Sequence, residues 1–256
     1  MKKLLNILII ILIISFIGSF GVLLLNKNND FNGSNNSNSS NSSVNSNIDF
    51  TQLTYTSLGD SITYGAYLKG KLENPYPILV GDELGLIKVT NLGVGGYTLA
   101  KDGKYGSIQD VVKNVPEYSN IISVMGGAND FAQSKTLGSI TDTDTKTIYG
   151  GLKYIAQTLI NEHPNSFIFF MTALPMGDKK LEQFSSSEIT IEEINVAVIE
   201  VAKLYNIPVL DTYNLADYQS EMNNSLVTDG CHPSKEFHEN KLAPLIAQFI
   251  KDNYKK

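Results

Sequence analysis

Two short segments of this chain bring together the residue types of a nucleophile and its base. Residues 59–65 read GDSITYG and place Ser61 on a turn between an apolar run and an expected helix start. Residues 229–233 read DGCHP and place Asp229 three positions before His232. A serine hydroxyl is weakly nucleophilic at neutral pH and needs a base within hydrogen-bond reach, which a carboxylate in turn orients. Ser61, His232 and Asp229 are therefore candidate catalytic residues.

His232 is the best candidate base among the three histidines, since it alone has a carboxylate at position i−3. His163 precedes a proline at an expected helix end, which predicts a capping or surface position. His238 lies in the polar stretch KEFHEN and is expected to face solvent. In an alternative interpretation, Asp229 only caps the turn that follows it.

Two further strings lie between these segments, NLGVGG at residues 91–96 and GAND at residues 127–130. The four strings, in this order, resemble the sequence blocks of the GDSL, or SGNH, family of serine hydrolases. The resemblance covers the chain from about residue 59 to residue 233. It implies an esterase or lipase that works through an acyl-enzyme at Ser61, without a metal or cofactor.

The resemblance also implies the donors for the negative charge that develops on the substrate carbonyl oxygen. They are the backbone N–H groups of Ser61 and Gly96 and the side-chain amide of Asn129, each worth roughly 2.7–4 kcal/mol where measured in other enzymes. Gly93 and Gly95 lie in the same string, and the spacing favours Gly96. A glycine suits this place because the backbone must approach the substrate closely.

Three other polar residues near these motifs are expected to have structural roles. Asp60 and Asp130 are expected to bond turn backbone rather than to take part in the chemistry. Cys231, the single cysteine, excludes an intramolecular disulfide and a cysteine-based metal site, and is expected to be a small, partly buried thiol beside the site. The alternative, a Cys–His nucleophile pair, is disfavoured because adjacent side chains point apart and Ser61 already fills that role.

Strand-like and helix-like segments alternate through the rest of the chain. Apolar runs typical of strands occur at 53–58, 88–92, 121–125, 167–172 and 208–211. Helical spacing occurs at 148–159, 191–205 and 242–250, where Pro244 is expected to kink or restart the last helix. This order predicts an α/β fold, a three-layer α/β/α sandwich of flavodoxin-like type with a central five-stranded parallel sheet. Each motif then lies at the carboxyl edge of that sheet, where such folds bind ligands.

The N-terminal part of the chain reads as a membrane anchor and a tether. Lys2 and Lys3 precede an uncharged run of 22 residues, 4–25, which as a helix would span about 33 Å, one bilayer core. No small-x-small cleavage site follows, so residues 1–25 are interpreted as an uncleaved signal anchor with its N-terminus in the cytoplasm, a cleaved signal peptide being the alternative. Residues 26–48 are almost all Asn and Ser and predict a disordered linker. The hydrolase domain then covers 49–256.

The amino-acid composition argues against nucleic acids and phosphate-containing molecules as ligands. A net charge of −6 gives no electrostatic footprint for nucleic acid. Arginine is absent, which argues against a substrate gripped through a phosphate group. We therefore expect an extracytoplasmic serine esterase for short-acyl or acetyl esters, on cell-surface glycans or small lipid-like molecules, held to the membrane by its N-terminal helix. A lysophospholipase-type lipase and a catalytically idle surface-binding module of the same fold remain alternatives.

Overall fold

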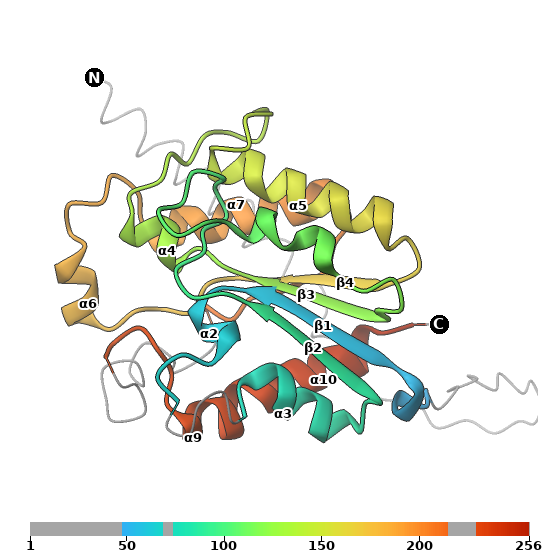
Figure 1. Ribbon diagram of the computed structural model, residues 1–256. Coiled ribbons are helices and arrows are strands. Elements are labelled where there is room, and N and C mark those ends of the chain that lie inside the picture. Colours follow the sequence, from blue (N-terminus) through green and yellow to red (C-terminus); the bar gives the residue numbers. More distant parts are fainter. Residues whose placement is uncertain (1–47, 69–73, 215–228, 256) are drawn as a thin grey trace, which may run out of the picture. The chain divides into compact units, whose positions relative to one another are not determined.

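A parallel β-sheet forms the middle layer of the protein (Figure 1). The computed structural model describes residues 48–68, 74–214 and 229–255. All recorded strand pairs are parallel, and the strand order is β2-β1-β3-β4-β5. The strands are β1 (Thr54–Gly59), β2 (Lys88–Gly93), β3 (Ile121–Met125), β4 (Phe167–Met171) and β5 (Val209–Leu210). The predicted five-stranded sheet is therefore confirmed, with the strand order of flavodoxin-like folds.

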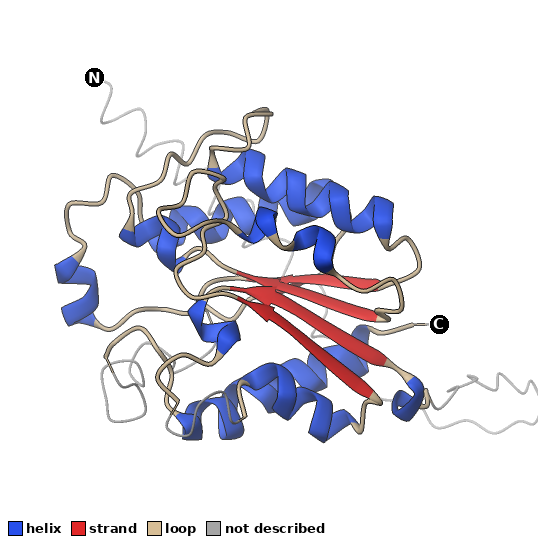
Figure 2. Cartoon of the chain, viewed as in Figure 1, coloured by secondary structure: helices blue, strands red, loops and turns tan. Residues whose placement is uncertain are grey.

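Helices cover both faces of the sheet (Figure 2). In Figure 1, α3 and α10 lie below the sheet, and α5 and α7 lie above it. The helices are α2 (Ser61–Tyr64), α3 (Tyr76–Leu84), α4 (Ala128–Ala132), α5 (Ile148–Glu162), α6 (Asp178–Gln183), α7 (Ile191–Leu204), α9 (Lys235–Phe237) and α10 (Ala243–Asn253). A π-helical turn at His238–Leu242 precedes α10, whose first turn contains Pro244, so the last helix restarts near the proline as predicted.

The two cores follow from the alternation of side chains along each strand. On β3, Ile122 and Val124 enter the core under α5 and α7, whereas Ile121 and Met125 enter the core over α3 and α10. A central parallel strand buried on both faces must be apolar along its length, which is why its run was visible in the sequence.

The described residues, from Ile48 onward, belong to one compact unit. The predicted anchor and nearly all of the predicted linker lie outside the described residues. Within the ranges that the structure describes, no helix is long and apolar enough to cross a membrane.

Candidate active site

Ser61 is the first residue of α2 and follows β1 by a tight turn. Asp60 caps the helix, its side-chain oxygen accepting the N–H of Ile62 at 2.9 Å. Gly59 lets the chain turn here, because a Cβ atom would collide with Thr63 and approach the carbonyl oxygen of Met125 to 2.7 Å. The turn places the serine hydroxyl at the carboxyl edge of the sheet, where α2, α4 and α6 gather (Figure 1).

The structure brings His232 to Ser61 although 171 positions separate them in the sequence. Ser61 Oγ lies 2.8 Å from His232 Nε2. On the other side of the ring, Nδ1 lies 3.1 Å from Oδ2 and 3.2 Å from Oδ1 of Asp229. This network assigns the proton to Nδ1, which donates to the carboxylate and leaves Nε2 to accept from the serine hydroxyl.

Asp229 is held as an ionised carboxylate by its own loop. Burial alone would raise the pKa of this carboxyl. Hydrogen bonds from the backbone N–H and the ring of His232, the charge of the His232 ring, and a hydrogen bond from the backbone N–H of Cys231 outweigh burial and lower the pKa below the usual range. Oδ1 accepts both backbone N–H groups, at 2.8 Å and 3.0 Å. The turn-capping role that was the alternative for Asp229 therefore coexists with its contact to the imidazole.

The three proposed oxyanion donors line the same cleft as Ser61. Asn129 is the second residue of α4, which follows β3, and one N–H of its amide donates to the carbonyl oxygen of Tyr97 at 3.0 Å. The second N–H has no acceptor among the described residues and is available to a ligand. The backbone N–H groups of Ser61 and Gly96 donate to no atom of the described residues. Gly96 has φ +83°, a conformation that favours glycine.

The alternatives to Gly96 lie in different places. Gly93 ends β2 beneath α2, where a Cβ atom would collide with the backbone of Thr63 and Tyr64, and its N–H donates to Asn91 Oδ1 at 2.9 Å. Gly93 is therefore turned away from the cleft, while Gly95 lines it together with Gly96.

The cleft has a volume of about 410 Å³, and both polar and apolar side chains form its walls. The side chains that line it around the Ser61–His232 pair are Ala66, Tyr67, Tyr105, Ala128, Ala132, Met176, Lys180, Phe184 and Cys231. Two of them, Tyr67 and Tyr105, are 65% and 63% exposed. The Tyr67 ring also lies against the ring of His232, with centroids 4.3 Å apart and the two planes tilted by 36°.

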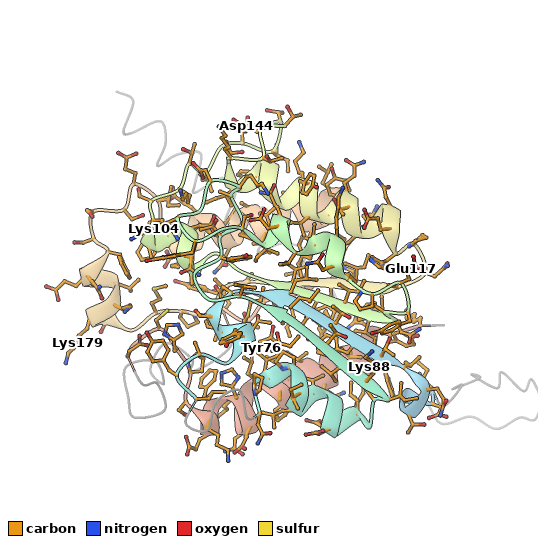
Figure 3. All side chains as sticks on the ribbon, in the orientation of Figure 1. Tyr76, Lys88, Lys104, Glu117, Asp144 and Lys179 are labelled. Carbon is orange, nitrogen blue, oxygen red and sulfur yellow. The ribbon has the colours of Figure 1, made fainter. Side chains whose placement is uncertain are left out.

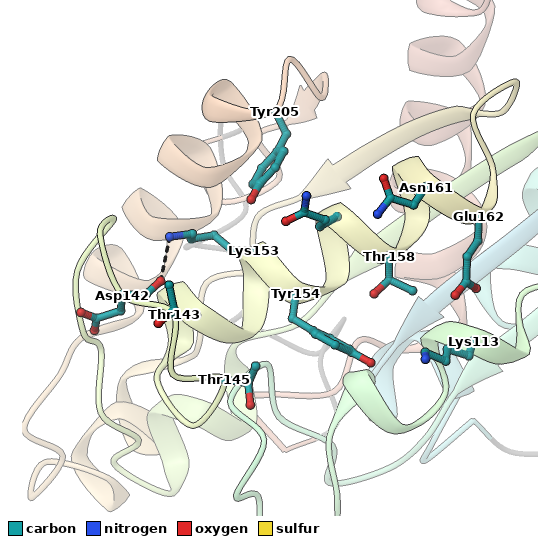
Figure 4. Close-up of a pocket in the computed structure, with 12 residues that line it drawn as sticks. Lys113, Asp142, Thr143, Thr145, Lys153, Tyr154, Thr158, Asn161, Glu162 and Tyr205 are labelled. Carbon is teal, nitrogen blue, oxygen red and sulfur yellow. Dashed lines mark hydrogen bonds between the residues drawn. The ribbon is translucent and has the colours of Figure 1, made fainter.

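A second hollow, of about 390 Å³, lies along the outer side of α5 (Figure 4). Its walls are polar and include Lys113, Lys153, Asn161 and Glu162. None of the motif residues lines it. The candidate chemistry therefore belongs to the cleft at Ser61.

The sequence model of the GDSL-like lipase/acylhydrolase family matches residues 57–239, which include every candidate site residue. The chain belongs to this family. The family hydrolyses carboxylic esters, so the protein is an esterase or acylhydrolase.

Solved structures with the same fold include several hydrolases. A protein from Lactobacillus plantarum is 22% identical with a TM-score of 0.70, over 81% of this chain and 100% of that one. A lipase/acylhydrolase from Enterococcus faecalis is 21% identical, with a TM-score of 0.59 over 80% and 98%. The aryl esterase of M. smegmatis is 14% identical, with a TM-score of 0.56 over 79% and 100%. At these identities the likeness supports the fold alone.

One curated protein, the Rho GTPase-activating protein gacE of Dictyostelium discoideum, is 30% identical over 114 residues. The match covers 44% of this chain and 10% of that protein, so the chain spans only a small part of its length.

One histidine prediction was wrong for this hydrolase. His238 was expected to face solvent but is 1% exposed, and its Nδ1 accepts the backbone N–H of Tyr76 at 3.1 Å. His163 was expected to cap a helix or lie at the surface, and it is the C-cap of α5, where its backbone N–H donates to the carbonyl oxygen of Leu159. Its ring is buried, and neither ring nitrogen has a hydrogen-bond partner in the described part of the chain. Polar neighbours in sequence did not reveal that both rings pack inward.

The predictions for the other polar residues hold. Asp130 accepts the N–H groups of Leu99 and Ala100 at 2.8 and 3.0 Å, as expected for a residue that bonds turn backbone. Burial raises the pKa of Asp130 to about 7 and that of Asp60 to about 6. Cys231 is buried beside the site, and burial raises the pKa of its thiol to about 12, which keeps it protonated and unreactive at neutral pH.

Sequence reasoning missed the cleft residues Tyr67, Tyr105 and Lys180. Lys180 lies after β4, at the sheet edge where all four motifs meet, and that position was the available signal. Tyr67 adopts φ +66° just beyond α2, and nothing in the sequence marks a tyrosine there as a neighbour of His232. Among the residues described, no group of three or more His, Cys, Asp or Glu side chains could hold a metal ion.

Proposed function

We propose that this hydrolase is an extracytoplasmic serine esterase that removes short acyl groups, such as acetyl, from cell-surface glycans or small lipid-like esters. The observation that carries the serine mechanism is the 2.8 Å contact between Ser61 Oγ and His232 Nε2, with Asp229 on the far side of the ring. A hydroxyl, a base and an orienting carboxylate in this arrangement are what nucleophilic acyl transfer needs.

In the acylation step, Ser61 Oγ forms a bond to the ester carbonyl carbon while its proton passes to His232 Nε2. The resulting imidazolium is stabilised by Asp229, which keeps its negative charge. Collapse of the tetrahedral intermediate breaks the bond to the alcohol oxygen, which takes the proton from His232 and leaves as the alcohol. The product on the enzyme is an acyl ester of Ser61.

In the deacylation step, His232 accepts a proton from water, whose oxygen attacks the acyl carbon. Collapse of the second tetrahedral intermediate breaks the bond between the acyl carbon and Ser61 Oγ, which takes that proton back from His232, and the carboxylic acid is released. In both steps the negative charge on the carbonyl oxygen is met by the N–H groups of Ser61 and Gly96 and by the free N–H of Asn129. Because Tyr97 already holds that amide in place, little reorganisation is needed when charge develops.

The walls of the cleft support an alcohol with a flat or polar surface. Tyr67 and Tyr105 present largely exposed rings with polar tips, which suit a partner that is apolar on one face and hydroxylated at its rim. The chain has no arginine to grip a phosphodiester bidentately, which disfavours the lysophospholipase alternative. The apolar N-terminal run and the Asn/Ser-rich segment support a domain tethered outside the membrane.

A fluorophosphonate probe tests the proposed function on the full-length protein. We expect the probe to label wild type at Ser61 and to leave Ser61→Ala unlabelled, with the fold of the variant unchanged by circular dichroism. A panel of p-nitrophenyl esters of increasing acyl length should show the highest kcat/KM at two to four carbons, and acetylated glycans should release acetate. An unlabelled wild type would instead support the idle binding module, and a preference for long acyl chains would support a lipase.

A further inference from the structure

Lys180 on α6 contacts the carboxylate that orients the base. Its Nζ lies 3.6 Å from Asp229 Oδ2, and the same oxygen lies 3.1 Å from His232 Nδ1. Lys180 and the imidazole therefore share one carboxylate oxygen, while the second oxygen accepts the backbone N–H groups of the loop. The ammonium group of Lys180 therefore weakens the electrostatic stabilisation that Asp229 gives to a protonated His232 ring.

The position of Lys180 is fixed by the docking of α6 on the loop that carries Asp229. The N–H of Gly177, which precedes the helix, donates to the carbonyl oxygen of Gly230 at 2.8 Å. A Cβ atom added to Gly230 would lie 3.4 Å from Cβ of Lys180, so one further side-chain atom on the loop would bring it into van der Waals contact with the lysine stem. The Lys180 side chain is 20% exposed, which makes this pair better shielded than an ordinary surface salt bridge.

Other titratable groups face the Asp229–His232 pair from the surrounding elements. They are Asp60 from the turn before α2, Tyr67 from the segment after α2, Cys231 from the loop itself and His238 from the turn before α10.

At neutral pH these groups add no second positive charge beside the pair. Burial raises the pKa of the Cys231 thiol to about 12, so the thiol is neutral, and burial lowers the pKa of His238 to about 4, so that ring is neutral too. Burial raises the pKa of Asp60 to about 6, so this carboxyl titrates within the working range, but it does so in every variant compared below.

We propose that Lys180 is a positioning residue that keeps His232 unprotonated at a lower pH than Asp229 alone would allow. Its ammonium offsets part of the carboxylate charge, so the imidazolium is favoured less and the ring remains able to accept the Ser61 proton in mildly acidic surroundings. The inference rests on the proposed serine-esterase function, in which His232 is the base.

The test compares pH profiles of full-length variants with p-nitrophenyl acetate as substrate. Lys180→Met should move the acid limb of kcat/KM upward by about half to one pH unit, the size expected for one partly screened charge at this range. On that limb the activity, expressed as a fraction of each variant's own plateau, falls about three- to tenfold, which is half to one pH unit. Lys180→Arg keeps the charge and should keep the wild-type profile.

Lys179→Met is the matched control, because it removes the same charge from the neighbouring position of the same helix. Lys179 points away from the body of the protein (Figure 3) and should leave the acid limb in place. An acid limb that does not move in Lys180→Met, or that moves equally in Lys179→Met, overturns the proposal. A change confined to KM for negatively charged esters would overturn it as well and make Lys180 a substrate contact.

A second measurement separates this inference from the proposed function. NMR titration of the His232 ring protons, assigned with a His232→Gln variant, reads the protonation of the imidazole without any turnover. The midpoint should rise in Lys180→Met relative to wild type and to Lys179→Met, and an unmoved midpoint refutes the role of Lys180 even if the enzyme is active. If Lys180→Met does not fold, Lys180→Gln replaces it.

Discussion

At the scale of single residues, the orientation of each group in the site depends on which of its atoms already makes a hydrogen bond to the protein. His232 uses Nδ1 for Asp229, and this leaves Nε2 for Ser61. Asn129 uses one amide N–H for Tyr97 and keeps the other. In both cases a bond outside the reaction fixes the orientation of the group that would take part in it, so the geometry exists before substrate binds.

The tautomer of His232 leads to the first prediction. Asp229→Asn preserves size and can still accept backbone N–H groups, but its amide can donate to Nδ1 and so favours the tautomer with the proton on Nε2. That proton blocks acceptance from Ser61, so kcat should fall by about 10⁴-fold with little change in KM. Steady-state kinetics check it, and activity equal to wild type would leave Asp229 with its capping role alone.

Loss of the oxyanion donor gives the second prediction. Asn129→Ala removes an N–H that meets the oxyanion more strongly than the ground-state carbonyl, so kcat should fall by roughly 10²–10³ with a smaller change in KM. Asn129→Asp keeps the shape of the side chain but removes the N–H donor and adds a negative charge beside the oxyanion, so kcat should fall at least as far. A change in KM alone would place Asn129 in substrate binding instead.

At the scale of helices and strands, the features that could be predicted are those that depend on the burial of neighbouring residues along one element. The run 121–125 is apolar throughout because β3 is buried on both faces, so the strand could be predicted. His238 could not be placed, because its partner, the first N–H of α3, is 162 positions away. Lys179 and Lys180 are equivalent as sequence, and only the docking of α6 decides that Lys180 faces Asp229.

His238 joins α3 to the C-terminal helices, and this contact gives the third prediction. Burial lowers its pKa to about 4 from an ordinary value of 6.5, so between these values the folded protein binds fewer protons than the unfolded chain. Stability contributed by the neutral ring is complete above pH 6.5 and is lost as pH falls toward 4, by at most about 3 kcal/mol. Urea unfolding of wild type and His238→Gln from pH 7 to pH 4 should show this loss as the difference between their slopes.

A second variant separates the hydrogen bond from the titration. His238→Phe fills the space without an acceptor and leaves the N–H of Tyr76 unpaired in the core, which should cost about 1–3 kcal/mol at pH 7. Glutamine at this position can still accept that N–H and should cost less. Equal stability of the two variants at pH 7 would show that the hydrogen bond contributes little.

At the scale of the whole molecule, the N-terminal region differs in composition from the folded unit, because it consists of an uncharged apolar run followed by a segment rich in Asn and Ser. Ile48 and Phe50 already pack against the core over α3 and α10, so the compact unit begins close to residue 48. Before it come about twenty residues dominated by Asn and Ser and an uncharged run of 22 residues. The residues proposed to react with substrate all lie beyond residue 60, within this compact unit.

Retention at the membrane is the last prediction. The uncharged run is long enough to span a bilayer as a helix, and Lys2 and Lys3 favour its N-terminus in the cytoplasm. Full-length protein should therefore pellet with membranes, resist carbonate extraction, and release an active fragment when protease is added from outside. A chain that starts at Asp49 should be soluble and keep the wild-type kcat/KM. Native protein found mainly in the medium with its N-terminus near Asn26 would show a cleaved signal peptide, and the proposed chemistry at Ser61 would stand, because every group proposed for it lies beyond residue 60.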